Sequence, residues 1–173
     1  MTTALTGPFG RAIENTVTML AACSAFRDFV NAPTAAIADE RIWKFGLPLP
    51  ATSVRHAESE REHYRPFAIV GMSDRNPWRR IKDSTHSFRS EGAIRIELER
   101  SGPADRGDGP YSEANATFHN AVDAIIGGLE DLLVASTGGY LCFTSIEEVE
   151  RGWELSGEVP SQLAILDLPI VGI

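Results

Sequence analysis

The chain has few cysteines and no long apolar run. Its two cysteines, Cys23 and Cys142, each lie in an otherwise apolar stretch. Two cysteines are too few for a disulfide framework, so they are interpreted as buried thiols in a reducing compartment. The longest apolar runs, such as Leu163–Leu166, fall far short of the ~20 residues that a membrane-spanning helix needs. No charged segment followed by an apolar one opens the chain, so we expect no secretion signal.

Several motifs of known chemistry are also missing. The sequence has no serine nucleophile elbow, no P-loop and no dinucleotide-binding fingerprint. The segment His56–His63 gathers metal-capable side chains, but it lacks the His-Glu-x-x-His spacing that places two imidazoles on one helix face. A charged surface loop explains it better. His86 and His119 stand alone, so no motif indicates a catalytic residue, a metal site or a cofactor.

The composition is that of a globular protein. Hydrophobic residues make up 43% of the 173 residues and charged residues 23%. These values exclude a largely disordered, collagen-like or coiled-coil chain. The length predicts one domain, covering residues 1–173.

Charge is unevenly spread along the chain. The formal net charge is −8, yet the part up to Ser112 carries +1 and the part from Glu113 carries −9, with Arg151 its only basic residue. Phosphate contacts need clustered lysine and arginine, so a nucleic-acid-binding face in the second half is not expected. An acidic solvated surface and a functional acidic lining both remain open.

Two stretches have the apolar periodicity of amphipathic helices. The first runs from about Pro8 to Val30, and the second from Glu113 to Ser136. Ser112 suits an N-cap of the second helix, and Gly138–Gly139 suit its end. The pair Gly127–Gly128 inside it either admits another backbone closely or is merely tolerated.

Strand patterns fill much of the remainder. Candidate strands are Arg41–Phe45, Pro66–Met72, Phe88–Glu99, Tyr140–Ile146, Arg151–Leu155 and Gln162–Val171. Pro169 predicts that the last strand lies near an edge or an irregular end of the sheet. The charged stretch Ser53–Tyr64 has no apolar period and is interpreted as an exposed connection.

The alternation in Phe88–Glu99 is the clearest pattern in the chain. One parity holds Phe88, Ile94, Ile96 and Leu98, which we expect to face the core. The other parity holds Arg89, Glu91, Arg95, Glu97 and Glu99, of which the last three are expected to point toward solvent or a neighbouring subunit. Gly92 suggests a bulge or bend within this strand.

The order of elements predicts an α+β fold. We expect a mainly antiparallel sheet with two long amphipathic helices packed on one face. The segment Trp78–Lys82 mixes aromatic and basic side chains between two strands. It could contact a phosphate backbone or an acidic partner, but a solvated loop with a tucked tryptophan is the favoured interpretation.

Four segments, taken in order, carry a resemblance to a known family. They are PFAIVGM (Pro66–Met72), EGAIRIELERSG (Glu91–Gly102), NATFHNAVDAIIGGLEDLL (Asn115–Leu133) and RGWELSGEVPSQLAILDLPI (Arg151–Ile170). The pattern resembles the tail terminator family of tailed bacteriophages, the lambda-type minor tail proteins that cap the tail tube. It covers most of the chain as an order of elements and not as an invariant motif. Relative to a compact member, residues 51–65 and 73–87 look like loop insertions.

This resemblance implies a structural virion protein and not an enzyme. Such proteins form a hexameric ring at the head-proximal end of the tail tube, terminate tube polymerisation and join the tail to the head connector. The implied partners are further copies of the chain, the tail tube protein, the connector or adaptor protein, and genomic DNA that passes without sequence-specific contact. The implied location is the tail or neck of the virion, assembled in the host cytoplasm, with no membrane partner and no cofactor.

A ring through which DNA passes benefits from an acidic wall, because carboxylates repel phosphates. Glu147, Glu148 and Glu150 are the candidate channel-lining residues. An exposed acidic turn explains the same segment almost as well.

Two other classes of function remain open from the sequence. One is another phage neck, tube or head-completion protein with a similar α+β layer. The other is a small-molecule enzyme or binding domain. The mass of the native particle separates a ring from a monomeric enzyme.

Overall fold

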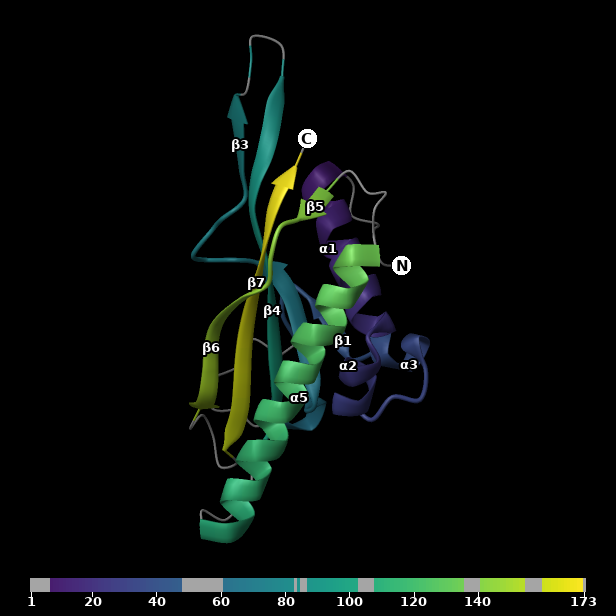
Figure 1. Ribbon diagram of the computed structural model, residues 1–173, viewed down its shortest axis with the longest axis vertical. Helices are drawn as coiled ribbons and strands as arrows, with labels where there is room; N and C mark the ends of the chain where they lie inside the picture. Colours follow the sequence, from purple (N-terminus) through teal and green to yellow (C-terminus); the bar gives the residue numbers. More distant parts are fainter. Residues whose placement is uncertain are drawn as a thin grey trace.

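A single twisted sheet with helices packed along one side organises the chain (Figure 1). The computed structural model describes residues 7–47, 61–82, 84, 87–102, 108–135, 141–154 and 160–172. Within these ranges the sheet has seven strands: β1 (Ile42–Lys44), β2 (Phe67–Met72), β3 (Arg79–Lys82), β4 (Phe88–Ser101), β5 (Leu141–Phe143), β6 (Glu147–Glu154) and β7 (Ser161–Gly172).

The sheet is mixed but mostly antiparallel, as the sequence predicts. Its main path runs β1-β2-β4-β7-β5, with β3 on β4 and β6 on β7. Only the β1–β2 pair is parallel among the described strands. Because β4 and β7 are the longest strands and pair over eleven positions, from Glu91↔Val171 to Ser101↔Ser161, they form the centre of the sheet.

The helices cover one face of this sheet. They are α1 (Gly7–Ala22), α2 (Ser24–Phe29), α3 (Ala35–Asp39) and α5 (Asp108–Ala135), and residues 61–64 form a further helical turn. Ile94, Ile96 and Leu98 of β4 are fully buried beneath the helices, as predicted from the alternation. Ile125 and Leu129 of α5 are fully buried as well. None of the helices in the described part of the chain is long and apolar enough to span a membrane.

The prediction of one continuous helix over Pro8–Val30 is wrong. The helix breaks at Cys23, whose extended backbone (φ −64°, ψ 118°) separates α1 from α2. The amide of Cys23 still donates to the carbonyls of Met19 and Leu20, and the apolar stripe continues through Phe26 on α2. Periodicity cannot reveal such a break, because the same residues stay buried on both sides of it.

The second helix starts earlier than predicted. α5 begins at Asp108 and not at Glu113, so Ser112 lies inside the helix and is not its N-cap. Pro110 is compatible with this start, since the first turn of a helix has no use for the amide that proline lacks. The predicted end at Gly138–Gly139 lies outside the described residues.

A glycine in α5 explains how the helices approach one another. A Cβ on Gly128 would lie 2.8 Å from Cys23 Sγ, so the bare glycine makes room for the break between α1 and α2. Gly127, its neighbour, has nothing within 4 Å of such an atom. Gly128 therefore admits a close neighbour, and Gly127 is simply tolerated.

Two predicted irregular segments contain regular structure. β6 begins at Glu147, so the acidic segment 147–150 is part of an edge strand and not a turn. Residues 73–87, predicted as a loop insertion, include β3. Pro169 lies in β7 opposite the break between β5 and β6, where Thr144 donates its amide to the Pro169 carbonyl. The expected edge position of this strand is wrong, because β7 lies at the centre of the sheet between β4 on one side and β5 and β6 on the other. The break between β5 and β6 is the irregularity next to Pro169. Residues 51–60 lie outside the described part.

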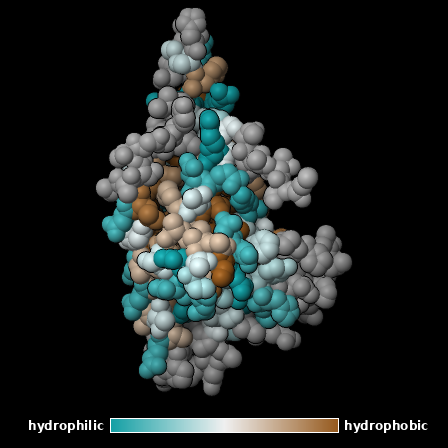
Figure 2. Space-filling view, turned by 90° about the vertical axis from the view of Figure 1, so that its right-hand side faces the viewer, coloured by the Kyte–Doolittle hydropathy of each residue, from teal (hydrophilic) through white to brown (hydrophobic). Residues whose placement is uncertain are grey.

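The β3–β4 hairpin projects beyond the rest of the sheet (Figure 1 and Figure 2). We call β3 with Phe88–Glu91 of β4 the arm. The pairing of β4 with β7 ends at Glu91, so Phe88, Arg89 and Ser90 have β3 as their only strand partner among the described residues.

Candidate functional site

The face of the sheet opposite the helices carries charge that is buried. Arg95, Glu97 and Glu99 of β4 lie on this face and were predicted to point outward. The predicted direction, away from the helices, is right. The predicted exposure is wrong for Arg95 and Glu99, which are 9% and 1% exposed, and Glu97 is half-buried. Segments distant in sequence cover them, and alternation within one strand does not report such cover.

Two arginines neutralise the Glu99 carboxylate. Arg65 Nε donates to Glu99 Oε1 at 2.6 Å, and Arg61 Nε donates to Oε2 at 2.6 Å. The side chains of Arg65 and Glu99 are each 1% exposed, so this ion pair is dry. Both arginines flank the helical turn at 61–64, which therefore closes this end of the open face.

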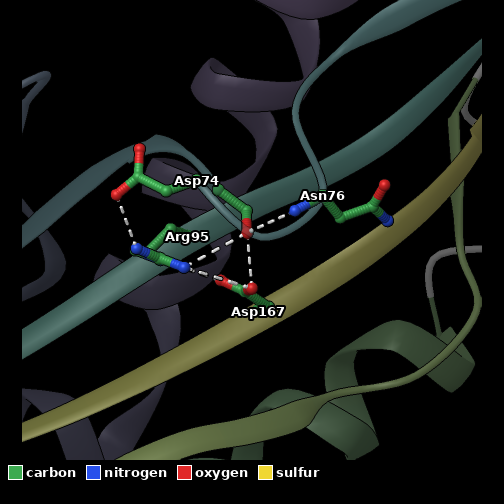
Figure 3. Close-up of polar contacts among 5 residues, drawn as sticks. Asp74, Asn76, Arg95 and Asp167 are labelled. Atoms are coloured by element: carbon green, nitrogen blue, oxygen red, sulfur yellow. Dashed lines mark hydrogen bonds and ion pairs between the residues drawn. The ribbon is translucent and has the colours of Figure 1, made fainter.

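A second cluster around Arg95 joins two strands, β4 and β7, to the loop that follows β2 (Figure 3). Arg95 Nε donates to Asp167 Oδ1 at 3.0 Å, and Nη1 donates to Asp74 Oδ2 at 2.9 Å. The Ser73 hydroxyl donates to the other oxygen of Asp167 and accepts from the amide of Asn76. Asp167 is 3% exposed, and Arg95 and Ser73 compensate its burial. The Ser73 contact also holds the loop after β2 against β7.

Glu97 lies between these two clusters without a hydrogen bond of its own among the described residues. Burial raises the pKa of its carboxyl above the usual value, although Arg61 and Arg95 oppose this shift. A small hollow of about 180 Å³ opens beside it, lined also by Phe45, Ile69 and Met72. The residues that line this hollow include no nucleophile. The acids among them are Asp74, which pairs with Arg95, and Glu97 itself.

The sequence contained a signal for part of this arrangement. Asp167 is the only charged residue in the apolar run Leu163–Val171. A lone acid in a buried strand must find a cation or a donor. Which cation it finds could not be predicted, because Arg95 is 72 residues away in the chain.

The arm carries a different kind of surface, with hydrophobic and hydrophilic atoms side by side at the top of Figure 2. Phe88 is 56% exposed, although its parity with Ile94 predicted a core position. This correction has a simple cause: β4 runs past the end of the core at Phe88. The guanidinium carbon of Arg80 lies 5.8 Å from the centroid of the Phe88 ring. Lys82 is the cross-strand partner of Phe88.

The base of the arm is rigidly attached. Gly92 has φ +147°, a conformation that favours glycine. A Cβ there would also lie 2.8 Å from Trp78 Cα, so glycine is needed for the backbone of Trp78 to pack this closely against β4. The Trp78 ring packs on Phe9 of α1 at 5.2 Å. The predicted tucked tryptophan is thus present, but the basic residues after it form a strand and not a loop.

The three predicted channel residues do not share one face. Glu148 is on the helix side of β6, where it pairs with Arg151, and Arg151 also reaches Asp123 of α5 at 2.7 Å. Glu147 and Glu150 pair with Asp167 and Ile165 of β7, which places both on the open face. Both are exposed, and neither has an ion-pair partner in the described part of the chain.

A larger cavity of about 660 Å³ lies between α2 and α5. Phe29, Ala121 and Ala124 make its apolar walls, and Arg100 supplies its one cation. Arg100 Nε donates to Gln162 at 2.8 Å and Nη2 donates to the Ala114 carbonyl at 2.7 Å. Burial lowers the pKa of Arg100, and its Nε and Nη2 already donate hydrogen bonds within the fold.

The remaining candidates from the sequence do not form a site. Cys23 is buried against α5, and His119 is exposed and lies edge-on to Phe118. His63 is exposed, whereas His56 and His86 lie outside the described residues, as does the side chain of Cys142. No group of three metal-capable side chains occurs among the residues that the structure describes.

The sequence was compared with known protein families and with curated proteins. No family model matches the chain, and no curated protein matches it.

Proposed function

We propose that this protein is a structural subunit of a phage virion that forms a ring at the head-proximal end of the tail tube. In this role it terminates tube polymerisation and joins the tail to the head connector. The order of elements supports the proposal, since the α+β layer follows the resemblance described above. The single observation that carries it is the arm, which projects from a folded body with an exposed aromatic residue and with two cations, Arg80 and Lys82, that have no carboxylate partner among the described residues.

In this proposal the arm binds another molecule. An isolated two-stranded hairpin is marginally stable in water unless something packs against it. Open strand edges are an aggregation liability unless a partner covers them, and β1 and β6 are edge strands here. A cyclic assembly of identical subunits covers such edges and leaves no free end.

The acidic half of the chain suits DNA transit. Exposed carboxylates repel phosphate, and the second half of the chain carries a net charge of −9. In the proposed ring, Glu147 and Glu150 face either the lumen or a neighbouring subunit, because both point from the open face of the sheet. The partners in this proposal are further copies of the chain, the tail tube protein, the head connector and the passing DNA, with no enzymatic step.

Electron microscopy of the purified protein tests this function. The protein is concentrated, mildly cross-linked and imaged, and two-dimensional class averages are computed. We expect closed rings with six-fold symmetry, and native mass spectrometry should give six times the mass of 18.8 kDa. Compact monomers both in the free protein and in the presence of tail tubes, with no cross-linked species above a dimer, would contradict the proposal.

A functional readout separates a terminator from other neck proteins. A tail tube protein is allowed to polymerise with and without this chain. A terminator should shorten the tubes and cap one end of each, whereas a head-completion protein leaves tube length unchanged.

A further inference from the structure

We propose that the arm of one subunit docks on the open face of β6 and β7 in the next subunit. Phe88 packs there against Leu163 and Ile165, while Arg80 and Lys82 pair with Glu147 and Glu150. This inference rests on the proposed ring and names the surfaces that close it.

The donor surface is one face of the arm. Arg80 and Lys82 are two residues apart on β3, and their partners on β4 are Ser90 and Phe88, so all three bulky side chains share a face. Arg79 and Arg89 lie on the other face, where both pair with Glu91. Arg80 and Lys82 have no carboxylate partner in the part of the chain that is described. The result is an exposed aromatic ring flanked by two free cations.

The acceptor surface has the complementary pattern. Leu163 and Ile165 of β7 are half-buried on the open face. Gly152 of β6 lies beside Leu163, and no atom of the described residues is within 4 Å of where its Cβ would be, so Gly152 leaves space next to Leu163. Glu147 and Glu150 border this apolar patch, and their carboxylates have no ion-pair partner among the residues that the structure describes. An aromatic ring laid over a glycine on a neighbouring strand is a favourable packing arrangement in sheets.

The two surfaces cannot meet within one molecule. The arm projects from one end of the sheet, and β6 lies toward the opposite end (Figure 1). Contact between two different patches on identical subunits is heterologous, and a rotation that closes generates a ring. Charge complementarity between the patches also sets the register and disfavours wrong pairings.

A nucleic acid is the competing occupant of the arm. The arm offers two free cations, but Glu91 lies at its base between Arg79 and Arg89, and the acidic half of the chain repels phosphate. A protein surface that supplies both an apolar patch and two carboxylates matches the arm better. The second copy of this chain has such a surface.

Charge reversal and its rescue test this contact. Arg80→Glu with Lys82→Glu reverses the donor, and Glu147→Lys with Glu150→Arg reverses the acceptor. Association is measured by sedimentation velocity over a concentration series. We expect each double variant to weaken association at least about tenfold, and the quadruple variant to regain most of that loss, because opposite charges again face each other.

Matched controls isolate the contact from net charge and from folding. Arg41→Glu with Arg75→Glu changes the net charge by the same amount at two exposed positions that belong to neither patch, and it should associate like the parent. Phe88→Ala removes the aromatic ring, and Gly152→Leu fills the space that the ring would occupy on the acceptor surface. Neither variant changes the charge, and both should weaken association. Circular dichroism melting checks that each variant is folded.

The outcomes separate this contact from the proposed function. If Arg80→Glu with Lys82→Glu still forms rings at the parent concentration, the docking contact is wrong and the ring stands. If that variant assembles normally but loses salt-dependent binding of a fluorescent DNA duplex that the parent binds, the arm contacts nucleic acid instead. A parent protein that never associates overturns both proposals.

Discussion

Asp167 and Arg95 form a largely buried ion pair whose loss is costly. Each is a charge removed from water, and their mutual contact offsets that cost only while both are present. We expect Asp167→Ala to destabilise the protein by about 3–5 kcal/mol, since it leaves Arg95 buried without its main partner. Urea unfolding followed by circular dichroism measures the loss.

The matching double variant distinguishes a broken pair from lost packing. Arg95→Met with Asp167→Leu replaces both charges by apolar side chains of similar size, so no uncompensated charge remains. It should recover most of the stability that Asp167→Ala loses. A double variant as unstable as the single variant would show that the loop held by Ser73 and Asp74 matters more than the charge pair.

Glu97 makes the stability of the fold depend on pH with the opposite sign to that of an ordinary ion-paired acid. Its pKa is raised in the folded state by burial, so the folded protein binds a proton that the unfolded chain has already released. Stability attributable to Glu97 is therefore greatest below its ordinary pKa and falls as pH rises through the raised value.

Glu97→Gln tests this sign. The amide is neutral at every pH, so we expect the variant to be more stable than the parent at neutral pH and to lose that advantage in acid. Thermal melts between about pH 4 and 8 measure the difference. A variant less stable than its parent at pH 7 would mean that Arg61 and Arg95 outweigh the burial of the carboxylate.

At the scale of the element, the glycine pair of α5 has two roles. Gly127 has open space where a Cβ would be, so Gly127→Ala should stabilise the protein by about 1 kcal/mol through helix propensity alone. Gly128→Ala should lose that gain or reverse it, because its Cβ would lie 2.8 Å from Cys23 Sγ. Thermal denaturation of the two single variants compares them directly.

A third variant identifies the cause. Cys23→Ala removes the sulfur that a Cβ at position 128 would meet, so Gly128→Ala should cost less in a Cys23→Ala background than in the parent. Equal costs in both backgrounds would place the strain elsewhere in the contact between α5 and the α1–α2 break.

At the scale of the whole molecule, we expect assembly to depend on salt. The proposed contact joins exposed cations to exposed carboxylates, and such pairs are screened as the Debye length shrinks from about 10 Å at 0.1 M salt to about 3 Å at 1 M. Light scattering should show a smaller average mass in about 1 M sodium chloride than in about 0.05 M. An average mass that grows with salt would mean that apolar burial dominates the contact.

The sequence by itself determined the layer and the helix-facing side of the sheet. Alternation of Ile94, Ile96 and Leu98 with charged residues specifies which face of β4 meets the helices, and the 3.6-residue period of α5 specifies which of its faces meets the sheet. These patterns are local, because a periodicity records the apolar face of one element. The α+β class and the mostly antiparallel sheet follow from the order of such elements.

Only the tertiary structure decided what covers the second face. Arg65 and Asp167 reach β4 across 34 and 72 residues of chain and bury Glu99 and Arg95, which local alternation assigns to solvent. Phe88 is the reverse case: its parity matches the core, but β4 extends past the helices there and leaves it exposed. The physical reason is the same for both, since burial depends on which distant segments pack against a residue, and a pattern within one strand contains no information about them.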